Sequence, residues 1–318
     1  MVKQLIVRPR IRLRPVTSEE PGGLYFSSEK KNYQFISSGC TTLDCVLGGG
    51  WPLGRIVNVV GDRSTGKTLL AMEAIANFFL KYDTGWARYV EAESAFDSDY
   101  ATALGIPMSR VENKNDLDTV EAVFEDLDAI AYKEPGLYIV DCLDALSDKA
   151  EMERGIGEGS YGAAKAKKLS ELFRRLVRKL SKKKICVMII SQVRDNIGIT
   201  FGEKHSRSGG KALDFYASQI LWLAHIKTNS REINKVKRPV SVRIKARCKK
   251  NKIGLPFREC EFNIRFGYGI EDTEACQEFL TTIGKTVPKT PEALREAVIR
   301  EWFAIEKKFI PEERKYGR

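Results

Sequence analysis

The residues with the clearest chemistry in this chain form a glycine-rich segment at 61–68, which reads GDRSTGKT. Its members are Gly61, Asp62, Arg63, Ser64, Thr65, Gly66, Lys67 and Thr68. This spacing of glycine, lysine and threonine is that of a phosphate-binding loop, in which backbone N–H groups surround phosphate oxygens. Lys67 would bring a positive charge to the β- and γ-phosphates of ATP, and Thr68 would offer a hydroxyl to Mg²⁺. The segment therefore predicts a nucleotide-binding site.

Polar residues at the ends of other apolar segments could complete such a site. Asp141 ends the run GLYIVD, which makes it the candidate to hold hydrated Mg²⁺; the alternative is an aspartate that only caps a turn. Glu91 and Glu93 both follow the run ARYV. Either could orient the water that attacks ATP, and their spacing does not choose between them. Gln192 follows ICVMIIS, where its amide is suited to sensing a γ-phosphate through hydrogen bonds.

The elements that must position these residues alternate between strands and helices. The apolar run at 55–61 predicts a buried strand, and the apolar residues of 67–82 recur at helical spacing. Further strands are predicted at 87–93, 136–141 and 185–191, and further helices at about 115–132 and 162–182. This alternation predicts an α/β fold with a mostly parallel sheet that is covered by helices on both faces.

The later part of the chain has a different pattern. The segments 218–227, 240–249 and 258–266 follow one another without a predicted helix, so we expect them to add antiparallel strands at the edge of the sheet. A helical pattern then covers 288–310, with Pro291 at a suitable helix start.

These patterns divide the chain into three expected parts. Residues 1–35 alternate basic and apolar residues and contain three prolines, which predicts an extended arm that contacts another subunit or is a loose tail. Residues 36–270 form the expected core, and 271–318 a small helical C-terminal region.

Composition limits the class of protein. The formal net charge of +11 favours a polyanionic partner such as nucleic acid, although excess lysine can also serve solubility alone. No run approaches the roughly 18 apolar residues of a membrane helix, and the basic N-terminus lacks the features of a secretory signal. We therefore expect a cytoplasmic protein, in the host cytoplasm if a virus encodes it. The seven cysteines are scattered without a CxxC pair, so we interpret them as structural.

Taken in order, these segments resemble the bacterial RecA recombinase family and its phage-encoded relatives, over about residues 36–270. The stretch SSGCTTLDCVLGGGWPLGRIVNVVG resembles the part of the family that leads into the phosphate loop, and VEAESAFDSDYATALGI resembles the stretch with the catalytic glutamate. SQVRDNIGITFG, followed by SGGKALDFYAS, is the closest match, and KKNKIGLPF resembles a subunit-boundary segment. The resemblance implies a RecA-like P-loop ATPase core.

The resemblance also implies roles for single residues. It gives Glu93 the catalytic role, and it implies that Asp97 and Tyr100 contact adenine, with the Tyr100 ring stacked on the base. Gln192 would couple the γ-phosphate to the DNA-binding loop after it. Two lysines would reach the phosphates bound by the neighbouring subunit, namely Lys250 and Lys252. Hydrolysis would then depend on assembly into a helical filament.

The resemblance implies that two loops, at about 153–162 and 193–210, line the filament axis. Both are rich in glycine and polar residues, which is typical of mobile loops. Basic residues within or beside them could bind phosphates without sequence selection, namely Lys165, Lys167, Lys168, Arg174, Arg194, Arg207 and Lys211. The apolar members Tyr161, Ile197 and Phe201 could support bases or pack the loops onto the core. The resemblance implies that Tyr161 and Ile197 insert between bases, and it includes the Gly209–Gly210 pair.

A secondary site for incoming duplex is also implied, at Lys245 and Arg247. The chain departs from the family near that site, because Ala224 and His225 stand where the family usually has arginines. Asp214 likewise stands where a lysine is usual.

The function implied is that of a DNA-dependent ATPase that forms a filament on single-stranded DNA and promotes homologous pairing and strand exchange. Its partners would be single-stranded DNA, homologous duplex DNA and further copies of itself, with a single-strand-binding protein or a recombination mediator as an added partner. One alternative is a RecA-paralogue accessory protein, which the intact second loop argues against. The other is a ring-forming helicase motor, for which the chain has no room for a primase-binding domain.

Overall fold

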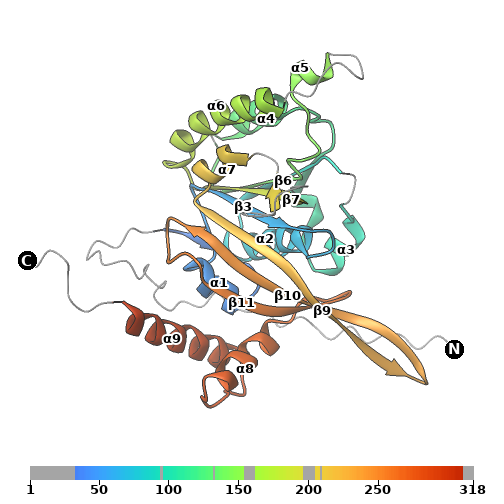
Figure 1. Cartoon of the computed structure of the whole chain (residues 1–318), viewed down its shortest axis with the longest axis vertical. Coiled ribbons are helices and arrows are strands. Elements are labelled where there is room, and N and C mark those ends of the chain that lie inside the picture. Colours follow the sequence, from blue (N-terminus) through green and yellow to red (C-terminus); the bar gives the residue numbers. More distant parts are fainter. Residues whose placement is uncertain are drawn as a thin grey trace, which may run out of the picture.

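The computed structural model describes residues 33–93, 96–131, 133–153, 162–195, 205–207 and 210–310. A mixed sheet of ten strands forms the centre of this part of the chain (Figure 1). The strands that run parallel to one another are, in spatial order, β9 (Gln219–Ile233), β3 (Ile56–Gly61), β7 (Ile185–Asp195), β6 (Gly136–Asp141), β4 (Trp86–Glu91) and β5 (Val111–Lys114). Every residue of β3 and of β6 is buried, as expected for parallel strands covered on both faces.

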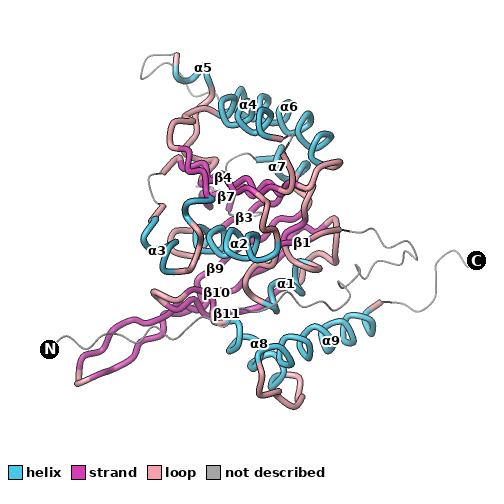
Figure 2. Tube along the Cα trace, turned by 180° about the vertical axis from the view of Figure 1, so that it is seen from behind, coloured by secondary structure: helices cyan, strands magenta, loops and turns pink. Residues whose placement is uncertain are grey.

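Helices cover both faces of this sheet (Figures 1 and 2), which confirms the predicted α/β class. One face packs against α1 (Thr41–Leu47), α2 (Lys67–Lys81) and α3 (Ser98–Ala103). The other packs against α4 (Val120–Ile130), α6 (Gly162–Leu180) and α7 (Gly210–Tyr216). Phe78 of α2 and Phe173 of α6 are fully buried, one in each layer.

Antiparallel strands extend one edge of the sheet, as predicted, but they begin one strand later than expected. They are β10 (Val236–Asn251), β11 (Glu259–Arg265) and β12 (Gly269–Ile270). The segment at 218–227 lies largely in β9, which pairs antiparallel with β10 as predicted but parallel with β3 on its other side, where the antiparallel expectation is wrong. The reason is that α7, which the sequence reading left out, connects β7 to β9 and turns the chain back to the same direction.

The remaining elements are short or lie near the ends of the chain. They are β1 (Phe35–Ile36), β2 (Trp51–Pro52), the 3₁₀ helix at Met108–Arg110, α5 (Lys149–Met152), β8 (His205–Arg207), α8 (Asp272–Thr282) and α9 (Pro291–Phe309). Pro291 begins α9 as predicted, after the N-cap Thr290. None of the described helices is long and apolar enough to cross a membrane.

The β9–β10 hairpin is much longer than the sequence predicts. It projects from the body of the molecule (Figure 1) and turns at Asn234 and Lys235, whose φ angles are 51° and 64°. Two consecutive residues with positive φ form the tight turn that suits the twist of a hairpin, and asparagine is favoured there.

One prediction concerns Asp44 of α1, whose carboxyl accepts hydrogen bonds from Ser37 Oγ at 2.5 Å and Ser38 N at 2.8 Å. Burial raises the pKa of Asp44 to about 7, whereas the unfolded chain has a pKa near 4. Between about pH 4 and pH 7 the folded state therefore binds a proton that the unfolded state releases. We expect the free energy of unfolding to fall as pH rises through this range, by up to about 4 kcal/mol.

Urea unfolding at a series of pH values measures this dependence. Asp44→Asn should flatten the slope, because its side chain does not titrate. An identical slope in the two proteins would contradict the assignment.

Candidate nucleotide-binding and hydrolysis site

The glycine-rich segment connects the end of β3 to the start of α2, the context that the motif requires. Gly66 has a φ of 85°, and a Cβ there would lie 2.4 Å from Ile264 Cδ1, so only glycine fits. The N-terminus of α2, which lies beside β3 (Figure 2), directs its free N–H groups toward this loop. The backbone thus has the shape of an anion-binding loop.

Lys67 is the first residue of α2, and its Nζ donates to the carbonyl of Asp62 at 2.7 Å. Burial lowers the pKa of Lys67, and the nearby Asp141 carboxylate opposes that shift. Because the ammonium lies over the loop, it is close to where phosphate oxygens would bind.

Asp141 lies at the end of β6 and is buried. Its Oδ2 accepts two hydrogen bonds, from Thr68 Oγ1 at 2.7 Å and from Tyr89 Oη at 2.5 Å. Burial raises the pKa of Asp141, and these two hydrogen bonds oppose the rise. No described residue donates to Oδ1. A hydroxyl beside a carboxylate suits Mg²⁺, which takes its other ligands from phosphates and water. Thr68 and Asp141 therefore fit the predicted metal role.

Tyr89 was not predicted to belong to the site. It lies within the apolar run of β4 and is fully buried. A buried tyrosine usually needs a hydrogen-bond partner for its hydroxyl, so a tyrosine in a buried strand could have indicated a polar group nearby. Here the partner is the carboxylate that would hold Mg²⁺.

The structure distinguishes Glu91 from Glu93, which their spacing in the sequence could not do. Glu91 is the last residue of β4, and its carboxylate accepts from Phe96 N at 2.5 Å and from Asn113 Nδ2 at 3.4 Å. Glu93 lies in the turn beyond β4 and is exposed. Its Oε1 accepts from Gln192 Nε2 at 2.6 Å. Glu91 thus holds its own turn together, while Glu93 contacts the predicted sensor.

Cys142 is a second missed neighbour of Glu93, because its thiol donates to the same Oε1. Burial, reinforced by Glu93, raises the pKa of Cys142 to about 12, so the thiol stays protonated and remains a donor. With two donors on Oε1, and none from a described residue on Oε2, the second oxygen is left for a water molecule.

Gln192 lies in β7, where its side chain reaches Glu93 and its backbone N–H donates to Asp144 Oδ2 at 2.8 Å. The next three residues of β7 pair with β8, from Val193 opposite Arg207 to Asp195 opposite His205. These paired residues lie within the second predicted DNA-binding loop, at 193–210, so its two ends form a short antiparallel pair. The central residues of that loop lie outside the described part of the chain. Gln192 therefore connects the predicted catalytic glutamate to the base of that loop.

The two residues predicted to contact adenine lie at the start of α3. Asp97 is its N-cap, and Oδ1 accepts from Tyr100 N at 2.9 Å. Tyr100 is partly buried against the core layer that contains α2, and burial raises its pKa. Their contact with a base stays a prediction.

Lys250 and Lys252 converge on the C-terminal end of α7. Their Nζ atoms donate to the carbonyl of Phe215, at 3.0 Å from Lys250 and 2.9 Å from Lys252, and Lys250 also reaches the carbonyl of Asp214. The last carbonyls of a helix carry partial negative charge, so they attract cations.

The structure describes the side chains of only some of the residues that were predicted to contact DNA. Lys167 and Arg174 are exposed and lie two turns apart on α6, which places them on the same side of that helix. Lys245 pairs with Glu259 at 2.6 Å, and Arg247 lies 3.9 Å from the same carboxylate. Only the backbone is described at Lys165, Arg194, Arg207, Gly210 and Lys211. Tyr161, Ile197, Phe201 and Gly209 lie outside the described residues.

A phosphate loop between a parallel strand and a helix, facing a strand-end aspartate in a mixed sheet, defines a P-loop nucleotide-binding protein of the RecA-like fold. The family model of the RecA N-terminal domain matches residues 24–271, and the chain therefore belongs to the RecA family.

Known proteins agree with this assignment. The chain is 38% identical over 246 residues to protein RecA of Prochlorococcus marinus strain NATL1A, a match that covers 76% of this chain and 63% of the relative. It is 37% identical over 254 residues to protein RecA of Thermosynechococcus vestitus, covering 78% and 68%. This chain thus spans less than two thirds of the length of the Prochlorococcus relative.

Among solved structures, that of the RadB recombinase is similar with a TM-score of 0.55 and 20% sequence identity, over 75% of this chain and 99% of that one. At this identity the similarity shows the fold alone.

Proposed function

We propose that this protein is a DNA-dependent ATPase that polymerises on single-stranded DNA and promotes homologous pairing and strand exchange. The observation that carries the proposal is the hydrogen bond between Glu93 and Gln192. It connects Glu93, which we propose activates water, with the strand that leads into a predicted DNA-binding loop. A protein that only binds nucleotide has no need of such a connection.

In the proposed reaction, the loop backbone and Lys67 bind the phosphates of ATP. Thr68 and Asp141 would hold Mg²⁺, which when bound neutralises charge on the β- and γ-phosphates. Glu93 orients the attacking water and accepts its proton at the carboxylate. The Gln192 amide can donate either to Glu93 or to a γ-phosphate oxygen, and a change of partner would move the start of the loop.

Assembly enters through Lys250 and Lys252. In the proposed filament they leave the α7 carbonyls and bind the triphosphate held by the neighbouring subunit. Their charge would stabilise the transition state only between subunits, so hydrolysis would require contact with a neighbour. A head-to-tail contact of this kind, when it does not close, produces an open helical filament.

Electron microscopy of the protein with ATP, Mg²⁺ and single-stranded DNA, together with a strand-exchange assay, tests the proposal. We expect helical filaments and exchange with homologous duplex. Closed rings that unwind duplex would favour a helicase motor, and DNA binding without exchange would favour an accessory protein. Full activity in an isolated subunit, unchanged by DNA, would exclude all three.

A further inference from the structure

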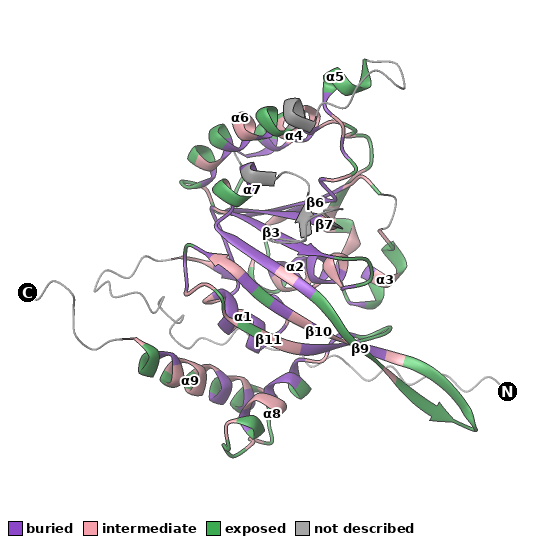
Figure 3. Ribbon diagram, in the orientation of Figure 1, coloured by how far each residue is buried: buried purple, intermediate pink, exposed green. Residues whose placement is uncertain are grey.

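The outer part of the β9–β10 hairpin, residues 226–240, is here called the ribbon. Beyond Leu223, β9 has no neighbour except β10, and β11 pairs with β10 only from Ser241 onward. The ribbon is therefore two-stranded, and nearly all of its residues are exposed (Figure 3). A two-stranded hairpin with both faces in water gains little stability from packing, so core formation does not explain its length or composition.

The ribbon is strongly basic. Its charged residues are Lys227, Arg231, Lys235, Lys237 and Arg238, against the single acid Glu232. None of these five basic side chains forms an ion pair with a described residue. Arg231 and Arg238 are register partners, so two positive charges lie directly opposite each other on one face. Like charges at such positions destabilise a hairpin, and an anion bound between them would remove that cost.

The face that carries this arginine pair continues toward the body of the molecule. Asn229 is opposite Ser241, and Lys227 is opposite Arg243, so polar and basic pairs follow one another along the ribbon. On β9 these residues are two apart and so share a face. On β10 a register shift between Pro239 and Ser241 keeps Arg238 and Ser241 opposite their β9 partners, so the pairs follow one another in one row.

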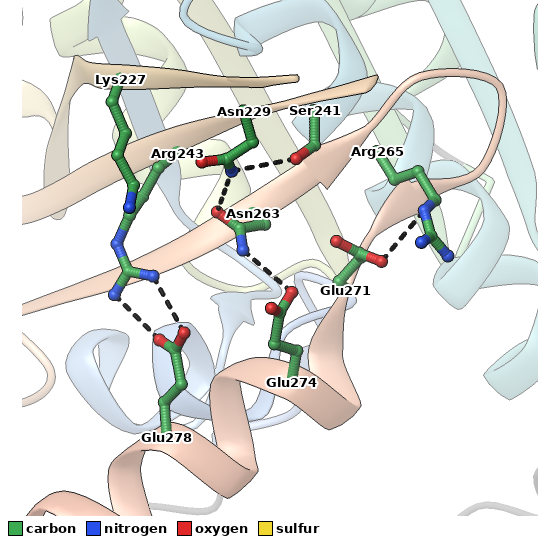
Figure 4. Close-up of a pocket in the computed structure, with 9 residues that line it drawn as sticks. All are labelled: Lys227, Asn229, Ser241, Arg243, Asn263, Arg265, Glu271, Glu274 and Glu278. Carbon is green, nitrogen blue, oxygen red and sulfur yellow. Dashed lines mark hydrogen bonds and ion pairs between the residues drawn. The ribbon is translucent and has the colours of Figure 1, made fainter. Parts of the chain in front are cut away.

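The positive charge at the base of the row is already neutralised, in contrast to the charge on the ribbon. Arg243 donates two hydrogen bonds to Glu278, at 3.0 and 2.8 Å (Figure 4). It donates a third to Glu261 at 2.7 Å. Arg243 is therefore held by acidic residues of the body, whereas Arg231 and Arg238 on the ribbon form no ion pair with a described residue.

We propose that the ribbon binds the phosphate backbone of duplex DNA through Arg231, Arg238 and Lys227. Three observations favour a duplex as the occupant. A two-stranded ribbon fits the major groove of B-form DNA, which is about 12 Å wide. A row of guanidinium and ammonium groups matches phosphates, without selection of sequence. Ile233 and Val236 are exposed register partners next to the turn, and they can make apolar contacts inside a groove.

This inference rests on the proposed function in one respect, since it names the surface that takes the duplex in strand exchange. Duplex binding itself is measured without ATP hydrolysis, so the two proposals can fail separately.

The test uses the full chain with Arg231→Ala and Arg238→Ala combined. Both side chains are exposed, so the fold should be retained, and the melting temperature should not fall because a like-charge pair is removed. Affinity for a short labelled duplex is measured by fluorescence anisotropy at a series of salt concentrations. We expect the slope of log affinity against log salt to decrease by about 2, from two lost phosphate contacts.

The matched control is Lys307→Ala combined with Lys308→Ala, which removes the same charge from the exposed last turn of α9. Its slope should equal that of the unmodified protein. An unchanged slope in the arginine variant, or an equal decrease in the control, overturns the proposal. Loss of binding to an acidic protein with duplex affinity unchanged also overturns it, in favour of a protein partner. ATPase activity stimulated by single-stranded DNA, measured on the same samples, reports on the proposed function independently.

Discussion

Replacement of Glu93 by glutamine is expected to lower kcat for DNA-stimulated ATP hydrolysis by about 10²- to 10⁴-fold, the usual contribution of a general base. Glutamine keeps the shape of the side chain and an oxygen that can accept from Gln192. It cannot take a proton from water. Nucleotide binding, measured with a fluorescent ATP analogue, should therefore remain close to that of the unmodified protein.

Glu91→Gln is the matched control, two residues earlier in the chain. The new side chain still has an oxygen to accept the hydrogen bond from Phe96 N, which is the shorter of the two that Glu91 accepts. Its kcat should stay within a few-fold of the unmodified value. Comparable losses in both variants, or a loss in Glu91→Gln alone, would contradict the assignment of Glu93 as the base.

The second large effect is expected from Lys67→Ala, which should reduce ATP hydrolysis to background. The ammonium is the charge that we propose to bind the phosphates, and its hydrogen bond within the described chain is to the carbonyl of Asp62. Because no core packing is lost, circular dichroism should show an unchanged fold. Hydrolysis retained in this variant would exclude the assigned nucleotide site.

Lys250→Ala should also lose hydrolysis, but by a different route, because its charge would act on the site of the neighbouring subunit. An equal mixture of Lys67→Ala and Lys250→Ala protein is therefore expected to regain activity. With random head-to-tail assembly, about a quarter of the interfaces would join an intact loop to an intact lysine. A mixture as inactive as its components would argue against sites shared between subunits.

The site was predictable where its residues are local in sequence. The segment 61–68 fixes the loop between β3 and α2, and Asp141 could be found because it ends an apolar run. Spacing alone could not distinguish Glu91 from Glu93, and only the family resemblance favoured Glu93, since the distinction depends on which carboxylate turns back to Phe96. The role of Tyr89 could not be predicted for a related reason. Its partner Asp141 lies on another strand, and the residue pattern of one β-strand does not reveal hydrogen bonds to a neighbouring strand.

The fold was predictable where burial imposes a period. The parallel strands and α2 show it, whereas the ribbon does not, because nearly all of its residues face water and its pattern resembles that of a loop. Helix α8 was not predicted, because it buries few apolar residues and most of them are small. They are Ala275, Cys276 and Leu280. Helix α7 was not predicted either, and the direction of β9 relative to β3 was therefore predicted wrongly. A short connector decides the direction of the strand that follows it.

The positions of Lys250 and Lys252 on the α7 carbonyls have a consequence for protein that is dispersed in solution. In the proposed mechanism, a solitary molecule would keep these cations on its own helix, and a triphosphate bound to it would have no neighbour to supply them. Such a molecule would hold its nucleotide without hydrolysing it until several copies assemble end to end on a DNA strand. Idle turnover in the cell would then stay low even when the protein is abundant.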